Sequence, residues 1–191
     1  MSIANRLLDE PRVWIEHLVV YWPEGSPIGA RLRRGYWARR LASAGARTSY
    51  GYGTRFDRPD LIHVGTRCSI SHSTVSASES LGIFIGDEVL ISSGCFLRAG
   101  LHAYSGIGAT IRAQGHECEE LEYAGRRSSI VIEDDVWLQP HSVVLSGAWI
   151  GRGSVILANS VVHERGAPGL IMQGNPARRV GQRARADGAT P

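Results

Sequence analysis

Two histidines, His102 and His116, are side chains that could move a proton at neutral pH. Histidine titrates near pH 6.5, so its imidazole can accept the proton of a hydroxyl group and later release it. Glu117 and Glu119 follow His116 closely. Either carboxylate could orient the imidazole, contact a substrate or stay in solvent. A histidine at either position could act as a general base.

The other histidines and the cysteines do not form a metal-binding pattern. None of the seven histidines lies four or five residues from another, and Cys68, Cys95 and Cys118 include no Cys-x-x-Cys pair. Structural zinc sites usually show such close spacings. We therefore expect no metal site and no disulfide framework, and this cysteine usage fits a reducing compartment.

A six-residue period runs through the C-terminal half of the chain. The residue two positions before each member of the period is aliphatic or small, and the same two columns recur upstream from Ile62 and from Ile83. The phase breaks near residues 77–82 and again between 98 and 111. A period of six fits neither an amphipathic helix nor a plain strand, so it indicates a short strand followed by a turn. The first column from position 132 onward is Ile132, Leu138, Val144, Ile150, Ile156 and Val162.

Three such units close a triangular coil of about 18 residues, and each coil pairs its backbone with the next at about 4.8 Å. The aliphatic column would fill the interior of the resulting prism. The 23 glycines among 191 residues fit its tight corners. The predicted fold is therefore mainly β, a parallel β-helix.

Residues 1–47 have a helical pattern instead. Ile15, Leu18, Val19 and Trp22 form one apolar stripe, and a second helical segment starts at Ile28 after a break rich in proline and glycine. A stack of coils leaves open strand edges, so we expect an N-terminal α-helical cap whose stripe packs on the first coil. The predicted division is a cap at 1–47, a β-helix at 48–181 and a flexible tail at 182–191.

The polar stretch Cys118–Ser129 lacks the six-residue pattern. We expect a protruding loop at about 117–129, which would place His116 where the loop leaves the wall of the prism. A histidine at such a junction would lie beside a cleft. General-base catalysis there would contribute about 10²–10⁴ in rate.

The charge balance limits the possible partners. The net charge of +3 and the isoelectric point of about 9.0 are too modest to indicate nucleic-acid binding. No acidic residue lies between Glu24 and Asp57, where several arginines occur. This basic, amphipathic segment could contact an anionic membrane surface, although capping alone explains it equally well. Acidic residues and Pro11 interrupt the start of the chain, so we expect no signal peptide and a cytoplasmic location, with the inner face of the membrane as an option.

Three motifs on the hexapeptide background resemble the hexapeptide-repeat acyltransferases, in the branch of the galactoside, maltose and colanic-acid acetyltransferases. Gly115-His116-Glu117 resembles that family's Gly-x-His-Asp or Gly-His-Pro segment. Residues 132–138 (Ile-Glu-Asp-Asp-Val-Trp-Leu) resemble its Ile-Gly-Asn-Asn-Val-Trp-Ile, and residues 174–178 (Gly-Asn-Pro-Ala-Arg) resemble its closing motif. The resemblance covers roughly residues 60–181 and implies a left-handed β-helix, against the usual crossover rule.

The resemblance implies an enzyme that uses acetyl-CoA as co-substrate and needs no metal. The γ-class carbonic anhydrases share this β-helix, but their His-x-x-x-His zinc pair has no counterpart here. Where relatives place a lysine after position 163 the chain has Glu164, which moves the expected phosphate contact to Arg165 and Arg178. The residues implied for coenzyme A are Trp137, Pro140, Ala158, His163, Arg178 and Arg179.

The resemblance leaves two choices for the base. Counting 17 residues from Ile85 gives His102, whereas counting 16 residues back from Ile132 gives His116. The local match favours His116, with Glu117 and Glu119 nearby as substrate contacts.

The implied function is O-acetylation of a sugar hydroxyl in a bacterial surface polysaccharide, such as lipopolysaccharide, or in its precursor. The alternatives are an N-acetyltransferase of an amino-sugar nucleotide and a non-catalytic β-helical assembly module. The family forms homotrimers with sites between neighbouring β-helices, and Trp149 and Phe96 are candidate trimer contacts.

Overall fold

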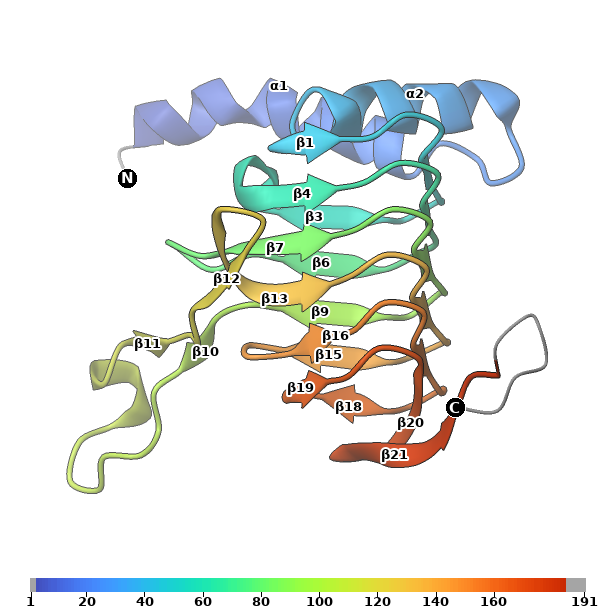
Figure 1. The fold of residues 1–191 in the computed structure, drawn as a ribbon. Coiled ribbons are helices and arrows are strands. Elements are labelled where there is room, and N and C mark those ends of the chain that lie inside the picture. The colour runs from blue at the N-terminus through green and yellow to red at the C-terminus, as the bar shows by residue number, and fades with distance from the viewer. Residues whose placement is uncertain (1–2, 185–191) are drawn as a thin grey trace.

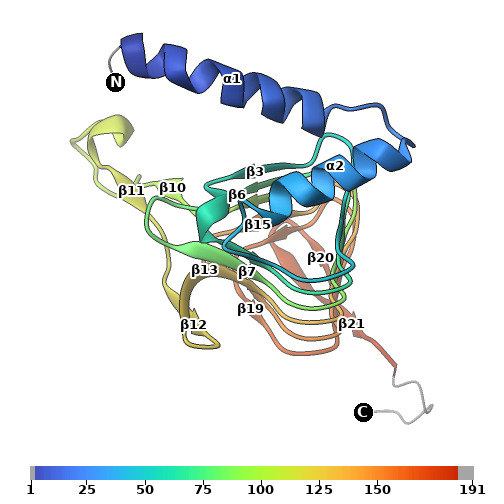
Figure 2. The ribbon, with the colours of Figure 1, turned by 90° about the horizontal axis from the view of Figure 1, so that it is seen from above.

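The structure, a computed structural model, describes residues 3–184, with only the backbone for residues 3–10 and 12. Three parallel sheets form a triangular prism (Figures 1 and 2). We name them sheets A, B and C in the order in which the chain visits them. Most of the tail predicted at 182–191 lies outside the described residues.

Each coil adds one short strand to each sheet. Sheet A holds β1 (Ser43–Ala44), β4 (Ile62–Val64), β7 (Gly82–Ile85), β13 (Arg126–Ile132), β16 (Trp149–Ile150) and β19 (Arg165–Gly166). Sheet B holds β2 (Ser49–Tyr50), β5 (Ser69–Ile70), β8 (Leu90–Ile91), β14 (Trp137–Leu138), β17 (Val155–Ile156), β20 (Leu170–Gly174) and the antiparallel β21 (Ala177–Gln182). Sheet C holds β3 (Arg55–Asp57), β6 (Thr74–Ser76), β9 (Phe96–Arg98), β15 (Val143–Leu145) and β18 (Val161–Val162).

The coil is left-handed. Seen from above in Figure 2, the chain turns counter-clockwise from sheet A through B to C, and Figure 1 shows that it descends away from that viewpoint. The left-handed β-helix predicted from the resemblance is therefore confirmed.

The interior contains the two predicted columns. All six members of the aliphatic column from Ile132 to Val162 are at most 2% exposed. The column two positions earlier, which ends in Ser142, Ala148, Ser154 and Ser160, is buried as well. Aliphatic side chains fill the prism, and the small residues let the backbone turn beside them.

The corners between sheets A and B use left-handed backbone, often without glycine. Arg67, Glu88 and Asp135 have φ of +55°, +59° and +57° at equivalent corners. A carboxylate ladder also links these corners, because Asp134 accepts a hydrogen bond from the Asp87 backbone N–H (2.8 Å) and Asp87 accepts one from the Thr66 N–H (2.7 Å).

The Thr66 N–H lowers the pKa of Asp87 by stabilising its charged form. A carboxylate whose pKa is depressed by folding contributes stability above its unfolded pKa, and this contribution is lost as pH falls through the folded value. We therefore expect acid to weaken the wild-type protein more than Asp87→Asn between about pH 5 and pH 2. Thermal melting across this range measures the difference, and parallel curves for the two proteins would contradict it.

Helix α2 (Pro27–Ala38) lies across the first coil, and α1 (Ile3–Val20) lies beside the prism at the same end. α2 starts at the N-cap Ser26, whose side chain accepts from the Gly29 N–H. It packs through Trp37 and through Arg33, which is 3% exposed and donates to the carbonyl oxygens of Tyr50 (3.0 Å) and Trp22 (3.1 Å). Burial lowers the pKa of the Arg33 guanidinium.

The prediction for the apolar stripe of α1 is wrong. Ile15 and Leu18 are 54% and 60% exposed, and Val20 is the buried residue of the helix among its described side chains. α1 stands away from sheet C, as Figure 2 shows, and its inner side carries Val13, Glu16 and His17 instead. The packing surface is therefore the last turn of the helix and not the stripe.

A long excursion replaces the corner between sheets C and A after β9. It contains β10 (Leu101–His102), the 3-10 turn Ile111–Ala113, β11 (His116–Glu117) and β12 (Leu121–Tyr123). It leaves the wall after β9, earlier than the loop expected at about 117–129. It also ends earlier, because residues 126–132 form the long strand β13. β12 turns back antiparallel on β13, and Tyr123 packs between Phe84 and Trp149.

Candidate active site

The excursion brings the two candidate histidines together. β10 and β11 pair antiparallel with His102 opposite His116, and their ring centroids lie 4.4 Å apart at an interplanar angle of 31°. Both side chains are exposed. The two positions that the sequence offered as alternatives therefore lie side by side.

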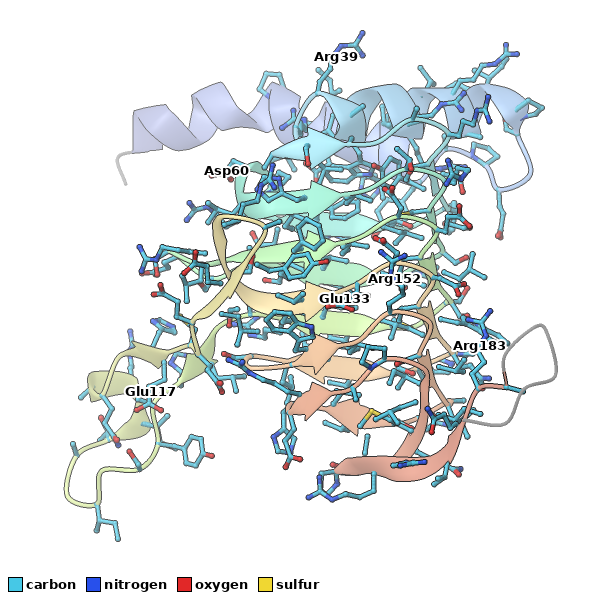
Figure 3. All side chains as sticks on the ribbon, in the orientation of Figure 1. Arg39, Asp60, Glu117, Glu133, Arg152 and Arg183 are labelled. Atoms are coloured by element: carbon cyan, nitrogen blue, oxygen red, sulfur yellow. The ribbon has the colours of Figure 1, made fainter. Side chains whose placement is uncertain are left out.

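The two nearby glutamates lie elsewhere. Glu117 is opposite Leu101, and alternate residues of a strand point to opposite faces, so its side chain lies on the face of the ribbon away from the histidines. Figure 3 shows Glu117 on the excursion, apart from the prism wall. Glu119 is bound at the foot of the excursion, where its backbone N–H donates to Ser146 Oγ (2.7 Å).

An ion pair closes the second hairpin of the excursion. Arg127 donates two hydrogen bonds to the Glu120 carboxylate (2.6 and 2.5 Å), which lowers the pKa of Glu120. Both side chains are largely exposed, so the pair fixes geometry more than it adds stability.

Trp137, Pro140 and Ala158 lie along a different part of the prism. Trp137 is on β14 in sheet B, 41% exposed, and its indole N–H donates to Ser92 Oγ (3.0 Å). Pro140 and Ala158 are in successive turns between sheets B and C, which are linked by a hydrogen bond from the Ala158 N–H to the side chain of Gln139 (3.3 Å). The structure groups these three residues along one edge.

His163 follows β18 at the corner between sheets C and A, beneath the excursion. Arg178 and Arg179 are exposed on β21. Arg178 forms an ion pair with Glu164 (2.9 Å), and Arg179 donates to the side chain of Gln182 (3.0 Å). Glu164 therefore binds the arginine expected to meet phosphate.

Within one protein chain, the two histidines lie apart from Trp137, Pro140 and Ala158. The excursion leaves the corner between sheets C and A, and Figure 2 shows it projecting away from sheet B. Trp137, Pro140 and Ala158 lie on sheet B and on its far corner. The width of sheet C separates them from the histidines.

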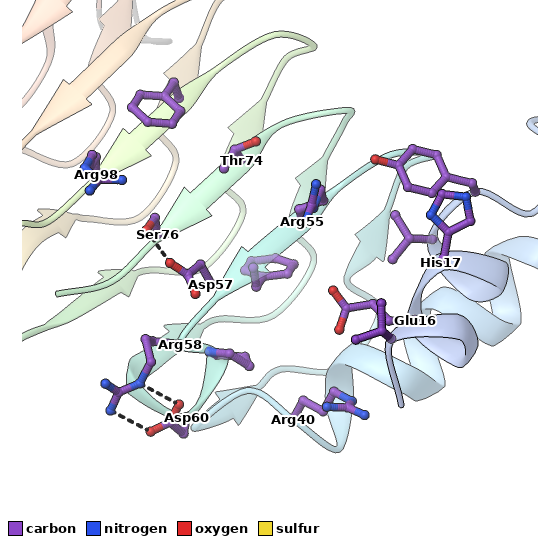
Figure 4. Close-up of a pocket in the computed structure, with 16 residues that line it drawn as sticks. Glu16, His17, Arg40, Arg55, Asp57, Arg58, Asp60, Thr74, Ser76 and Arg98 are labelled. Atoms are coloured by element: carbon purple, nitrogen blue, oxygen red, sulfur yellow. Dashed lines mark hydrogen bonds and ion pairs between the residues drawn. The ribbon is translucent and has the colours of Figure 1, made fainter. Parts of the chain in front are cut away.

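A pocket of about 890 Å³ opens between α1 and sheet C (Figure 4). Its wall includes the outward side chains of β3, β6 and β9, and its rim includes the Arg58–Asp60 ion pair. Ser76 donates to Asp57 (3.0 Å), and Arg98, at the edge of the pocket, precedes His102 by four residues. The pocket offers carboxylates, guanidinium groups and the aromatic face of Phe96.

The sequence interpretation missed this pocket. In each of the three strands the middle residue is buried and its neighbours face outward, as in Arg55-Phe56-Asp57. The six-residue register already gives that alternation, so the polar residues that face outward from sheet C could have been predicted from the sequence. The position of α1 over those residues could not.

The two residues expected at a trimer contact differ in exposure. Trp149 is half-buried, because Tyr123 covers it and its indole N–H donates to Glu133 (2.9 Å). Phe96 is 36% exposed on sheet C. Of these two residues, Phe96 is the more exposed.

Comparison with known proteins agrees with the repeat pattern. A family model described as bacterial transferase hexapeptide (six repeats) matches residues 129–164. A 2,3,4,5-tetrahydropyridine-2,6-dicarboxylate N-acetyltransferase from Clostridium perfringens is 42% identical over 52 residues, which are 27% of this chain and 22% of that protein. A probable macrolide acetyltransferase from Lysinibacillus sphaericus is 32% identical over 116 residues, 52% of this chain and 63% of that protein. This chain therefore spans less than two thirds of each relative.

Solved structures match along nearly the whole chain. A hexapeptide-repeat acetyltransferase from Vibrio cholerae, complexed with acetyl coenzyme A, has a TM-score of 0.70 at 23% identity and covers 95% of this chain and 90% of its own. A galactoside acetyltransferase in complex with coenzyme A has a TM-score of 0.69 at 22% identity, covering 95% and 91%. The repeats, the left-handed prism and these matches together show that the chain has the fold of the hexapeptide-repeat acetyltransferases.

Proposed function

We propose that this protein is an acetyl-CoA-dependent O-acetyltransferase that acts on a sugar hydroxyl of a bacterial surface polysaccharide or its precursor. The observation that carries the proposal is the His102–His116 pair, displayed on an excursion from the wall of a hexapeptide β-helix. Galactoside acetyltransferase has the same fold. An exposed imidazole is suited to take a hydroxyl proton at neutral pH.

In the proposed reaction His116 is the base, with His102 as the second choice. The imidazole accepts the proton of the acceptor hydroxyl while that oxygen attacks the thioester carbonyl carbon. The tetrahedral intermediate then collapses, the carbon–sulfur bond breaks, and the imidazolium returns its proton to the thiolate of coenzyme A. The products are the acetyl ester and the free thiol, and no covalent intermediate forms on the enzyme.

The co-substrate is proposed to lie along the edge that carries Trp137, Pro140 and Ala158. The exposed Trp137 ring offers an apolar face for the pantetheine arm, and the small Ala158 leaves room along the wall. Arg178, Arg179 and His163 are the proposed phosphate contacts. The Arg178–Glu164 pair is largely exposed, so a phosphate can replace that carboxylate at small cost.

A second copy would complete this site. The histidines and Trp137 lie on different corners of one prism, so the excursion of one copy must meet the Trp137 edge of another. A ring of three copies repeats this contact around one axis and closes. We expect light scattering after size exclusion to give a trimer, whereas an active monomer would overturn the composite site.

The pocket under α1 is the proposed position of the acceptor. Carboxylates such as Asp57 accept hydrogen bonds from sugar hydroxyls, guanidinium groups donate to them, and aromatic faces such as Phe96 cover the apolar side of a sugar ring. Glu117 and Glu119, predicted as substrate contacts, stay candidates on the excursion.

Contact with a membrane is part of the proposal, for a cytoplasmic enzyme that modifies lipid-linked sugars. Trp14, Ile15 and Leu18 expose an apolar face on α1, and Arg31 and Arg34 are exposed on α2. No described helix is long and apolar enough to cross a membrane. Flotation with anionic vesicles tests the contact, and a protein that stays with the soluble fraction contradicts it.

N-acetylation is the second candidate, because a relative named as an N-acetyltransferase is 42% identical over 52 residues. A screen of sugars with labelled acetyl-CoA separates the two reactions, since O-transfer requires thiol release with an acceptor that has hydroxyl groups and no amine. Acetylation of amino sugars alone would favour N-transfer. A protein that binds no coenzyme A would be an assembly module.

Trp137→Ala is expected to weaken coenzyme A binding by about tenfold, because an aromatic face against the pantetheine arm is lost. Calorimetry measures the dissociation constant. Trp14→Ala removes another exposed tryptophan, on α1 and outside the proposed coenzyme edge, and is the control. Equal dissociation constants for Trp137→Ala and wild type would remove Trp137 from the proposed site.

A further inference from the structure

The two legs of the excursion are joined at their feet by a chain of hydrogen bonds. The Glu119 N–H donates to Ser146 Oγ (2.7 Å), Ser146 Oγ lies 2.8 Å from Ser129 Oγ, and Ser129 Oγ donates to the Ala99 carbonyl (3.0 Å). Ala99 is where the excursion leaves the wall, and Glu119 is on the leg that returns.

The direction of the chain follows from the number of protons. Each serine has one hydroxyl proton, and that of Ser129 goes to the Ala99 carbonyl. Ser146 must therefore donate to Ser129, while it accepts from Glu119. Every bond then runs from Glu119 to Ala99, and such aligned bonds strengthen one another. Ser129 is fully buried, which protects the chain from water.

The two ends of this chain of hydrogen bonds lie at equal sequence distances from the two histidines. His102 is three residues after Ala99, and His116 is three residues before Glu119. Three residues of extended chain span about 10 Å, so each imidazole is carried on a short leg from an anchored foot. The Ala103 N–H to Gly115 carbonyl bond (3.1 Å) ties the legs again above the feet.

Gly147 allows the returning leg to lie close to the wall. Its φ is +88°, and a side chain there would collide with the Glu119 carboxylate. In the preceding coil the same corner is a short turn closed by Ser78, which bonds both the N–H and the carbonyl of Leu81. The serine chain takes over that closing role where the excursion is inserted.

We propose that Ser129 and Ser146 are positioning residues, which hold the two legs of the excursion at the distance that sets the His102–His116 pair. This inference rests on the proposed function for its kinetic consequence, but not for its structural one. Neither serine touches a reacting atom. Their effect reaches the reaction through the placement of the imidazoles, where a displacement of about 1 Å can cost up to about 100-fold in rate.

The test compares Ser146→Ala with Ser154→Ala and Ser146→Thr. Ser154 is a matched control, because it also accepts from a backbone N–H (Leu170, 3.1 Å) and donates to a carbonyl (Ala167, 3.3 Å), but at a corner without the excursion. Hydrogen–deuterium exchange of residues 99–119 reports the anchor, and kcat with KM for acetyl-CoA reports its consequence.

We expect Ser146→Ala to speed exchange across residues 99–119 and to lower kcat about tenfold with KM for acetyl-CoA within twofold of wild type. Ser154→Ala should change neither, and Ser146→Thr, which keeps the hydroxyl, should restore both. Unchanged exchange in Ser146→Ala, or a loss of kcat no greater than in Ser154→Ala, overturns the positioning role. A wild-type protein without acetyl transfer would instead refute the proposed function, and the exchange data would still decide the anchor.

Discussion

Replacing His116 with alanine is expected to lower kcat for acetyl transfer by about 10²–10⁴-fold, the range for loss of a general base. The acceptor hydroxyl then keeps its proton during attack on the thioester. The affinity for coenzyme A should change little, because the proposed contacts of the coenzyme are Trp137, Pro140, Ala158 and the arginines of β21, and His116 is proposed to act on the acceptor hydroxyl. Thiol release measures kcat, and calorimetry measures coenzyme A binding.

His102→Ala is the informative partner of this variant, since the two rings lie 4.4 Å apart. We expect a smaller loss than for His116→Ala. If the order is reversed, His102 is the base and His116 its neighbour. His63→Ala removes a histidine that binds Ser43 on sheet A and controls for changes in the fold. Full activity in both His102→Ala and His116→Ala would rule out general-base catalysis by this pair.

Leu138→Ala is expected to lower the free energy of unfolding by about 2–5 kcal/mol. Leu138 is fully buried in the aliphatic column, so its removal leaves a cavity between coils that the neighbouring strands cannot close. Denaturant unfolding at one fixed protein concentration measures the change, because association of copies would also contribute to stability.

Leu90→Ala is the matched control for this prediction. Leu90 lies on the same sheet, next to Trp137 on the paired strand, but it points outward and is 47% exposed. We expect a loss below about 1 kcal/mol, since much of the side chain already contacts water. Similar losses for the two variants would mean that the inward and outward columns are not distinguished by burial.

The prism could be predicted from the sequence because the six-residue period reflects which side chains are buried. An aliphatic residue such as Ile150 is found at every sixth position, and each of these residues is buried at the equivalent place in its coil. The corners were less readable. Arg67 and Glu88 adopt left-handed backbone where glycine would be expected, because the surrounding strands fix the turn.

The packing of the N-terminal cap and the geometry of the candidate site could not be predicted, because both depend on contacts between residues far apart in the sequence. The stripe of Ile15 and Leu18 has helical spacing, but spacing does not determine which face meets the prism. His102 and His116 are 14 residues apart in the chain and meet only because the excursion folds back on itself. The ion pair between Arg178 and Glu164 likewise joins β21 to the bend that precedes β19.

The point at which the excursion leaves the prism has an evolutionary consequence. It replaces a corner between two coils, so β9 and β13 keep their places in the stack whatever the length of chain between them. The entropic cost of lengthening such a loop grows only slowly. Insertions and deletions at this corner can reshape the surface around the histidines while the scaffold stays intact, which makes the excursion the part of the molecule best able to acquire a new acceptor.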